Sequence, residues 1–282
     1  MEKRMSEQEL IDSFETALRE KHIYACYQAQ INHSTGRMVG AEALMRWRDP
    51  EYGMQYPVDF IPVLEKHDLI YQADIYLFES VCRFQKECID RNILVIPISV
   101  NVSRHDIYRH DYVDEIENIR IKYNIPVKYL RIEITESSAI AGMELMTSVI
   151  SHLHKLGYIV EMDDFGSGYS SLNILKNLDI DIIKLDMAFL RGEIGGRGGI
   201  IINTIVQMAK WLGTPLIVEG VETAEQADYM KSIGCNYIQG YLYSKPMQEE
   251  EFRAEVEKIG SSTFYVEFYT GNRSSLMGAA IR

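Results

Sequence analysis

The sequence is short of positive charge relative to negative charge. Its 282 residues carry 29 Lys and Arg against 41 Asp and Glu, so the formal net charge is −12 at pH 7. Most of a protein's affinity for duplex nucleic acid comes from Lys and Arg that neutralise phosphates over a broad surface. We therefore expect no duplex nucleic acid partner. Any phosphate-bearing ligand must be bound by a few local residues.

Regularly spaced cysteines and long apolar runs are also lacking. Cys26, Cys82, Cys88 and Cys235 form no CxxC pair, so they indicate neither a zinc site nor a disulfide framework. The first nine residues are charged where a signal peptide would be apolar, and no apolar run approaches the ~20 residues of a membrane span. We expect reduced thiols and a cytoplasmic chain without a membrane span.

The sequence supports neither a serine hydrolase nor a mechanism based on clustered histidines. No GxSxG motif is present to support a serine hydrolase. The 7 histidines do not cluster: His152 and His154 stand two positions apart on a predicted helix and do not face one another, and none of the histidines lies at a predicted strand end. Neither mechanism is favoured.

What the sequence has is an alternation of short β-branched runs with longer segments of helical period. The candidate strands are Ile23–Gln30, Met38–Trp47, Ile96–Val102, Leu130–Thr135, Tyr158–Asp163, Ile182–Leu185, Leu216–Val221 and Tyr237–Gly240. The predicted helices include Ala73–Arg91, Tyr112–Tyr123, Met143–Leu156, Ile201–Leu212 and Ala224–Ser232. Since a barrel of this class typically needs about 250 residues, the alternation predicts an α/β fold of the (β/α)8 TIM-barrel type.

The first two strands do not fit a regular barrel. Only Ile31–Arg37 lies between them, whereas parallel strands need a connection of a dozen or more residues. The first strand should therefore run antiparallel to its neighbour. The predicted fold is a modified TIM-type barrel whose other seven strands are parallel.

We divide the chain into three parts. Residues 1–22 are a helical lead-in, residues 23–260 form the barrel, and residues 261–282 are a tail to which we assign no role. Within the barrel, Gly192–Gly199 reads GEIGGRGG and lacks the GK[ST] ending of a phosphate-binding loop. This composition favours a flexible connection over a nucleotide cradle.

Polar side chains recur at or near the C-terminal ends of the predicted strands. They are Glu42, Asn101, Glu133, Asp163, Asp164, Lys184, Glu219 and Gln239. In a TIM-type barrel this end of the strands carries the active site, so residues far apart in the sequence would meet there. A single carboxylate is most often a solvated surface charge, but so many packed together are unfavourable unless cations neutralise them.

The donor atoms indicate which cation. Oxygen ligands suit Mg²⁺ or Mn²⁺ rather than zinc, and the adjacent Asp163 and Asp164 offer the bridge that two ions about 3.5–4 Å apart would need. Such a pair activates water for an in-line phosphoryl displacement. Lys184 adds a cation, and Arg46, four residues after Glu42, either clamps a phosphate or forms an ordinary surface ion pair. The pattern favours a hard-metal site for phosphoryl chemistry.

Seven ordered motifs resemble those of one protein family. They are VGAEALMRW, which contains Glu42-Ala43-Leu44, SVNVS (Ser99–Ser103), EITES (Glu133–Ser137), DDFGSGYSSL (Asp163–Leu172), KLD (Lys184–Asp186), VEGVET (Val218–Thr223) and QGY (Gln239–Tyr241). Together, from about Tyr27 to Pro246, they resemble the EAL-domain cyclic di-GMP phosphodiesterases. The chain departs from the family at Ala29, where the family often has proline after Tyr-Gln, and in Gly192–Gly199.

The resemblance implies metal-dependent hydrolysis of cyclic di-GMP to linear pGpG, with two Mg²⁺ or Mn²⁺ ions per site. It implies that the first ion is held by Glu42, Asn101, Glu133 and Asp163, and the second by Asp163, Asp164 and Glu219. The implied catalytic residues are Glu219 as candidate base, Lys184 at the attacking water or the phosphate, and Asp163. Cyclic di-GMP would contact Gln28, Leu44, Arg46 and Gln239. The implied supporting residues are Glu136, which would anchor the loop Asp164–Ser171, Glu222 and Asp186.

The resemblance also implies partners. Family members dimerise through the region after the DDFGSGYSS loop, and many carry a sensory or GGDEF domain, either fused to the chain or separate. Two other functions stay open: a catalytically silent receptor for cyclic di-GMP or a regulatory module for a protein partner, and a barrel metallohydrolase for another phosphodiester. Because every implied ligand is present, the sequence favours the enzyme.

Overall fold

The computed structural model describes residues 4–107, 109–140, 142–166, 171–186 and 196–260. The first half of the chain contains α1 (Glu7–Arg19), β1 (Ile23–Asn32), β2 (Arg37–Asp49), β3 (Gly53–Gln55), α2 (Pro57–Lys66), α3 (Ile70–Asp90), β4 (Ile98–Val102), α4 (Arg104–Ile107), α5 (Tyr112–Tyr123), the 3-10 helix η1 (Val127–Tyr129) and β5 (Leu130–Thr135). The second half contains α6 (Glu136–Ile140), α7 (Met143–Leu156), β6 (Ile159–Asp163), α8 (Ser171–Asn177), β7 (Ile182–Asp186), α9 (Arg197–Leu212), β8 (Leu216–Glu219), α10 (Ala224–Ser232), β9 (Tyr237–Gln239), β10 (Met247–Gln248) and α11 (Glu249–Gly260).

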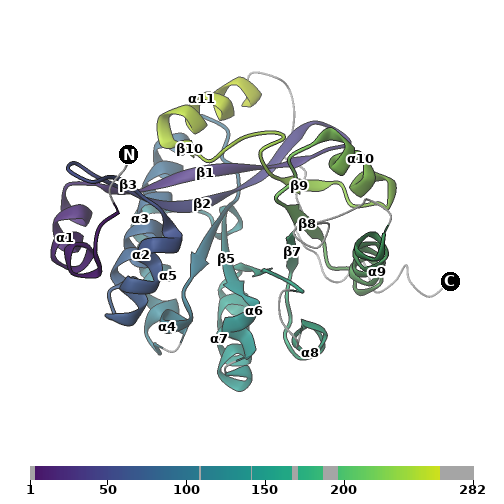
Figure 1. Ribbon diagram of the computed structural model, residues 1–282, viewed down its shortest axis with the longest axis horizontal. Helices are drawn as coiled ribbons and strands as arrows, with labels where there is room; N and C mark the ends of the chain where they lie inside the picture. Colours follow the sequence, from purple (N-terminus) through teal and green to yellow (C-terminus); the bar gives the residue numbers. More distant parts are fainter. Residues whose placement is uncertain (1–3, 108, 141, 167–170, 187–195, 261–282) are drawn as a thin grey trace.

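Eight strands close into a barrel. They follow one another in the order β1, β9, β8, β7, β6, β5, β4 and β2, and β2 pairs again with β1. Strand β1 is antiparallel to both of its barrel neighbours, whereas the pairings from β2 through β9 are all parallel. The modified barrel predicted from the short first connection is therefore confirmed. Figure 1 shows the long β1–β2 pair crossing above the remaining strands.

Strand β5 illustrates how the barrel is filled. Leu130, Ile132 and Ile134 are buried on its outer face, toward the surrounding helices. Arg131 and Glu133 alternate with them and are also buried, but they contact side chains of strands across the barrel. Because successive side chains of a strand point to opposite faces, the apolar core lies outside the barrel wall and polar layers lie inside it.

Helix α1 covers one end of the β1–β2 pair. Ser6 and Glu9 form a capping box at its start, which satisfies two backbone N–H groups of the first turn. Phe14 is buried on the inner face of the helix, with its ring centroid 6.3 Å from that of Trp47 on β2. The lead-in is thus attached to the barrel through aromatic packing.

Two features differ from the sequence-based expectation. The short strands β3 and β10 extend the sheet beside β2 and β1 and were not predicted, because two or three residues carry no recognisable period. Gly198 and Gly199 lie within α9, so the end of Gly192–Gly199 is helical rather than a loop. The beginning of that segment and the tail 261–282 lie outside the described residues.

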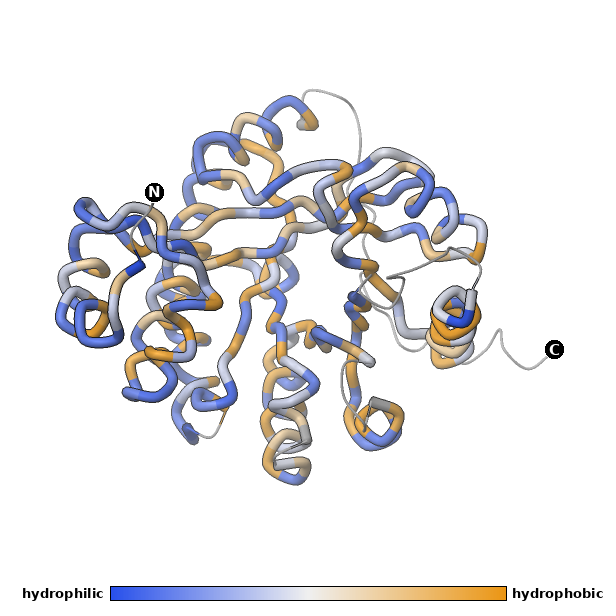
Figure 2. The backbone as a smooth tube through the Cα atoms, in the orientation of Figure 1, coloured by the Kyte–Doolittle hydropathy of each residue, from blue (hydrophilic) through white to orange (hydrophobic). Residues whose placement is uncertain are grey.

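The surface of α9 is partly apolar. Ile200, Ile201, Trp211 and Leu212 are exposed, Trp211 to 85%. Figure 2 shows this helix as a largely orange, hydrophobic segment at the edge of the molecule. Among the described residues, no helix is long and apolar enough to cross a membrane.

Candidate active site at the carboxyl end of the barrel

Lys184 is the centre of the polar layer at the carboxyl ends of the strands. Its Nζ lies 3.0 Å from Glu42 Oε2, 2.5 Å from Glu133 Oε1 and 2.7 Å from Glu219 Oε1. Asp163 Oδ1 is 3.9 Å away. The five residues come from β2, β5, β6, β7 and β8, so the structure brings together groups that the sequence separates widely. The convergence predicted from strand-end positions is observed for them.

The remaining strand-end groups extend this cluster. Asn101 on β4 donates from Nδ2 to Glu42 Oε1 at 2.8 Å. Gln239 on β9 donates from Nε2 to Glu42 Oε2 at 2.5 Å and to Gln28 Oε1 at 3.3 Å. Gln28 in turn donates to the Ser244 carbonyl at 3.1 Å. Glu42 is therefore held by three different side chains.

The cluster has more negative than positive charge. Burial, reinforced by Glu42, raises the pKa of Glu133 well above its usual value, and burial, reinforced by Asp163, does the same for Glu219. Burial alone would lower the pKa of Lys184, but the surrounding carboxylates, Asp163 foremost, outweigh it and raise that pKa. For Asp163 burial is outweighed chiefly by Lys184, so its pKa is lowered. One ammonium cannot neutralise four carboxylates.

Further cationic charge would therefore be stabilised here. Glu133 Oε2 is buried and has no hydrogen-bond partner, so a polar oxygen of the cluster lacks compensation. The available donors are carboxylate and amide oxygens, and these are the ligands of hard divalent cations. In the described part of the chain, however, no three His, Cys, Asp or Glu side chains form a ready metal-binding group, because the carboxylates are turned toward Lys184. The chemistry of the donors fits a hard cation.

Asp164 is placed differently from its neighbour. It follows the end of β6 with a φ of +55°, in the left-handed region that few residues other than glycine adopt. Its backbone N–H donates to Asp163 Oδ1 at 2.7 Å. The residue as a whole is exposed to solvent, although its carboxyl group is partly buried. The four ion pairs of Lys184 in the described residues do not include Asp164. Burial and then Asp163 raise the pKa of Asp164.

Glu136 connects two strand ends. It begins α6 directly after β5, is buried, and accepts a hydrogen bond at Oε2 from the Gly166 backbone N–H at 2.9 Å. Phe165 N–H donates to the Lys184 carbonyl at 3.1 Å. The start of the loop Asp164–Ser171 is thus held from both sides, and residues 167–170 lie outside the described part.

The other two supporting positions lie near the ends of β7 and β8. Asp186 ends β7 and stands opposite Glu219 in the β7–β8 register. Glu222 is exposed beyond β8, where its backbone N–H donates to Gln226 Oε1 at 2.8 Å. Glu222 lies just before helix α10 and is not among the ion-pair partners of Lys184 in the described residues.

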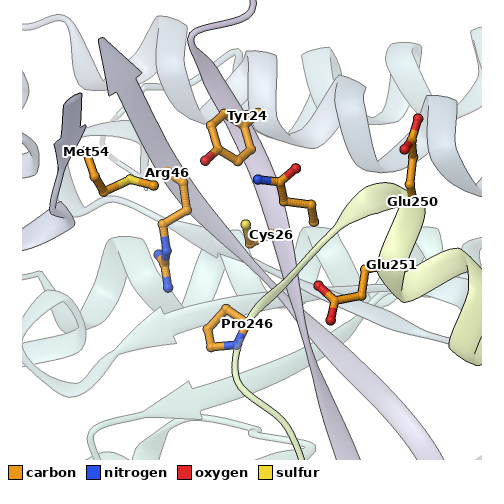
Figure 3. A pocket seen from close by; sticks show the side chains of 8 residues that line it. Tyr24, Cys26, Arg46, Met54, Pro246, Glu250 and Glu251 are labelled. Atoms are coloured by element: carbon orange, nitrogen blue, oxygen red, sulfur yellow. The ribbon is translucent and has the colours of Figure 1, made fainter. Parts of the chain in front are cut away.

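A recess lies further along the β1–β2 pair, beyond the residues of the cluster. Gln28 stands opposite Glu42, Cys26 opposite Leu44 and Tyr24 opposite Arg46, so these alternate residues share one face. The recess has a volume of about 390 Å³ and is lined by Tyr24, Cys26, Arg46, Met54, Pro246, Gln248, Glu250 and Glu251. Figure 3 shows Arg46 and Glu251 approaching it from opposite sides.

Sequence reasoning identified only Arg46 in this recess. Met54 comes from the unpredicted strand β3, and Gln248 comes from the unpredicted β10. The alternation Gln28, Cys26, Tyr24 could have indicated the inner lining, since these residues share a face with the predicted ligand positions. Arg46 itself donates from Nη1 to the Met45 carbonyl at 2.8 Å.

The sequence is similar to one known family and to several curated proteins. The model of a family described as "EAL domain" matches residues 11–246. Among curated proteins, the chain is 31% identical over 250 residues to the "Bifunctional diguanylate cyclase/cyclic di-GMP phosphodiesterase MucR" of Pseudomonas aeruginosa, a match that covers 88% of this chain and 36% of that protein. It is 34% identical over 238 residues to the "Cyclic di-GMP phosphodiesterase PdeR" of Escherichia coli, covering 84% of this chain and 36% of that protein. The chain thus spans little more than a third of these relatives.

Solved structures resemble the barrel closely. "PaMucR Phosphodiesterase, c-di-GMP complex" aligns with a TM-score of 0.81 at 31% identity, over 86% of this chain and 99% of that one. An EAL domain protein from Listeria monocytogenes EGD-e aligns with a TM-score of 0.76 at 28% identity, over 89% of this chain and 97% of that one. The barrel of this chain corresponds to nearly the whole of each of these structures.

Proposed function

The chain belongs to the EAL domain family, and we propose on this premise that it hydrolyses cyclic di-GMP to linear 5′-pGpG with Mg²⁺ or Mn²⁺ ions. One observation supports the proposal above the others. Four carboxylates from different strands surround Lys184 at the carboxyl end of the barrel, and a recess of about 390 Å³ lies further along the β1–β2 pair. The names of MucR and PdeR, which include cyclic di-GMP phosphodiesterase, point to the same substrate.

The reaction adds water across one phosphodiester bond. The water oxygen forms a bond to phosphorus, the bond from phosphorus to the ribose 3′ oxygen breaks, and that oxygen takes up a proton. The phosphate stays on the 5′ oxygen of the other nucleoside. Opening one of the two diester linkages in this way turns the cyclic dinucleotide into 5′-pGpG.

Divalent ions at this site would lower the pKa of a water molecule and neutralise phosphate oxygens. We assign the first ion to Glu42, Asn101, Glu133 and Asp163, and the second to Asp163, Asp164 and Glu219. The uncompensated Glu133 Oε2 and the excess of negative charge support this assignment.

Lys184 and Glu219 have proposed roles in the chemistry itself. The Lys184 ammonium is buried and stays charged because carboxylates surround it, so it can stabilise a phosphate oxygen or orient the attacking water. Glu219 is the candidate base, since its raised pKa makes its carboxylate a better proton acceptor than an exposed glutamate. Both side chains already lie 2.7 Å apart.

The nucleotide would lie along the β1–β2 pair. Gln28, Leu44 and Gln239 stand beside Glu42 and would position the dinucleotide backbone, and Arg46 would contact a phosphate. The recess beyond Arg46 supplies room for one nucleobase, and its polar lining offers hydrogen-bond partners.

We also propose a cellular location and partners for the protein. The four cysteines are free and buried, which supports a cytoplasmic location. A homodimer through the region that follows the DDFGSGYSS loop would cover exposed apolar side chains such as Leu172 on α8. Because the chain spans little more than a third of MucR and PdeR, a fused or separate sensory or GGDEF domain is part of the same proposal.

One assay tests the central proposal. Purified protein is incubated with cyclic di-GMP and Mg²⁺ or Mn²⁺, and the nucleotides are separated by chromatography. Linear pGpG is expected, and only in the presence of the metal.

One observation favours a second candidate, a catalytically silent receptor for cyclic di-GMP: the carboxylates form ion pairs with Lys184. Tight binding of cyclic di-GMP without any pGpG would support the receptor and reject the enzyme.

A further inference from the structure

A second polar layer lies inside the barrel next to the Lys184 cluster. On β5 and β6 its residues come two positions before Glu133 and Asp163. It contains Gln30 on β1, Ser99 on β4, Arg131 on β5 and Glu161 on β6, each at most 1% exposed. Arg131 Nη1 donates to Glu161 Oε1 at 3.1 Å, and Ser99 Oγ donates to Glu161 Oε2 at 2.8 Å. This buried ion pair belongs to none of the groups assigned above to metal, nucleotide or water.

The second layer is connected to the first by hydrogen bonds. Arg131 Nη1 also donates to Gln30 Oε1 at 3.2 Å, and Arg131 Nη2 donates to the Val39 carbonyl at 3.3 Å. Gln30 Nε2 donates to Gln239 Oε1 at 3.1 Å, and Gln239 Nε2 donates to Glu42 Oε2 at 2.5 Å. An unbroken path therefore runs from Arg131 to Glu42.

The direction of every bond in this path follows from one property of arginine. A guanidinium can only donate hydrogen bonds, so the Gln30 amide must turn its oxygen toward Arg131. Its NH₂ group then faces Gln239, which must present its own oxygen to it. The NH₂ group of Gln239 is thereby directed at Glu42. If the Gln239 amide were reversed, its oxygen would face a carboxylate oxygen, which is repulsive.

We propose that Arg131 is a positioning residue that sets the orientation of the Gln30 and Gln239 amides and, through them, holds the Glu42 carboxylate. The proposal rests on the proposed function, because Glu42 is one of the residues assigned to the first metal ion. Glu161 keeps the guanidinium in place and compensates its charge within the barrel.

Gly40 gives independent support for a close-fitting layer. A Cβ atom at this position on β2 would lie 2.6 Å from Gln30 Oε1 and 3.0 Å from Arg131 Nη1. Both distances are shorter than normal contacts, so a larger residue would displace the first bond of the path. The absence of a side chain at Gly40 is what gives Gln30 and Arg131 room to meet.

The test removes the guanidinium without leaving a buried charge. Arg131→Met alone would strand the Glu161 carboxylate, so it is combined with Glu161→Gln, which keeps an acceptor for Ser99 Oγ. A second variant, Gln30→Met, breaks the path and leaves the Arg131–Glu161 pair intact. The matched control is Gln85→Met in α3, which removes another buried amide whose Nε2 donates to the Ile96 and Tyr129 carbonyls.

Two measurements are made on each purified protein. The first is the ¹⁵N–¹H spectrum of the glutamine side-chain NH₂ groups without metal or nucleotide, with the Gln239 signals assigned by their loss in Gln239→Leu. The second is cyclic di-GMP turnover with Mg²⁺ or Mn²⁺. Circular dichroism and thermal melting confirm that each variant is folded.

The expected result separates the path from general loosening. The double variant and Gln30→Met should shift the Gln239 NH₂ signals and lower kcat by about 10–100-fold with little change in KM, as for loss of partners that orient a metal ligand. Gln85→Met should do neither. Unshifted Gln239 signals in a folded double variant, wild-type kcat in it, or an equal loss of kcat in Gln85→Met would overturn the proposal. If the wild-type protein forms no pGpG, the proposed function fails, and the spectra still decide the role of Arg131.

Discussion

Glu136 Oε2 accepts a hydrogen bond of 2.9 Å from the backbone N–H of Gly166, which joins the start of α6 to the loop after β6. Gly166 has a φ of +95°, a conformation that other residues resist. Asp164, the proposed ligand of the second ion, lies two residues before this contact. The Glu136 carboxylate is therefore in a position to control how Asp164 is presented.

Removal of the Glu136 carboxylate should reduce turnover. We expect Glu136→Ala to lower kcat by about 10–100-fold, because the loop that carries Asp164 loses its support. The free energy of unfolding should fall by only ~1–3 kcal/mol, the usual penalty of an unsatisfied buried N–H group. Glu136→Gln keeps an oxygen for Gly166 N–H and should recover much of the activity. Normal kinetics and normal metal dependence in Glu136→Ala would identify Glu136 as a structural charge only.

Loss of one proposed ligand charge should abolish turnover. Asp163→Asn and Glu42→Gln each replace a carboxylate in the Lys184 cluster by an amide of nearly equal size, so the fold should be retained while metal-dependent hydrolysis is almost lost. Steady-state kinetics at saturating metal measure the effect. Glu144→Gln, at an exposed position on α7, is the matched control and should be fully active. Substantial activity in either cluster variant would contradict the ligand assignment.

Metal removal should stop the reaction reversibly. We expect no pGpG in excess EDTA and full recovery when Mg²⁺ or Mn²⁺ is restored. Ca²⁺ should be a poor substitute, because its longer and looser coordination does not keep the tight octahedral geometry of the smaller ions. Product chromatography before chelation, after it and after metal addition provides the measurement. Undiminished turnover in EDTA would rule out metal catalysis.

A buried aspartate pair should make stability depend on pH. Asp74 on α3 and Asp106 on α4 are both buried, and Asp74 Oδ2 accepts from Ser103 N–H at 3.1 Å. Burial, and then the neighbouring Asp106 carboxyl, raise the pKa of Asp74 well above its ordinary 3.8. Between the unfolded and the folded pKa the native state holds the extra proton, so this contribution is complete below the unfolded value and is lost as pH rises through the folded one.

Asp74→Asn should flatten that dependence. Urea unfolding of the wild-type protein between pH 4 and neutrality should show stability falling with pH more steeply than in the variant, by up to ~1.4 kcal/mol per pH unit. Asp12→Asn, at an exposed position on α1, serves as control and should follow the wild type. Parallel curves for the wild type and Asp74→Asn would mean that Asp74 is ionised throughout this range.

The proposed dimer should depend on α8. Leu172 is 66% exposed, and its substitution by aspartate would place a charge in an apolar contact between subunits. We expect Leu172→Asp to shift the protein from dimer to monomer in sedimentation velocity, while Asn173→Asp, at the next exposed position, leaves the dimer unchanged. A wild-type protein that sediments as a monomer at micromolar concentration would remove the dimer from the proposal.

The architecture and the end of the barrel at which polar groups collect could both be predicted from local features of the sequence. The seven-residue connection Ile31–Arg37 is too short for a parallel crossover. The antiparallel first strand therefore followed from the length of this connection alone. Strand periodicity and strand ends are local properties, and the carboxyl ends of parallel strands must meet on one face. Glu42, Glu133, Lys184 and Glu219 were therefore predicted together before their distances were known.

Which of these groups touch one another depends on how the strands pack in three dimensions. The stagger between neighbouring strands turned Glu42, Glu133 and Glu219 toward Lys184 and left Asp164 outside its ion pairs. Arg131 and Glu161 form their pair inside the barrel although nothing in the sequence marks them as partners. Strands β3 and β10 add Met54 and Gln248 to the recess without a recognisable pattern of their own. Contacts across a barrel depend on the tilt and stagger of all its strands, and no local stretch of sequence encodes these.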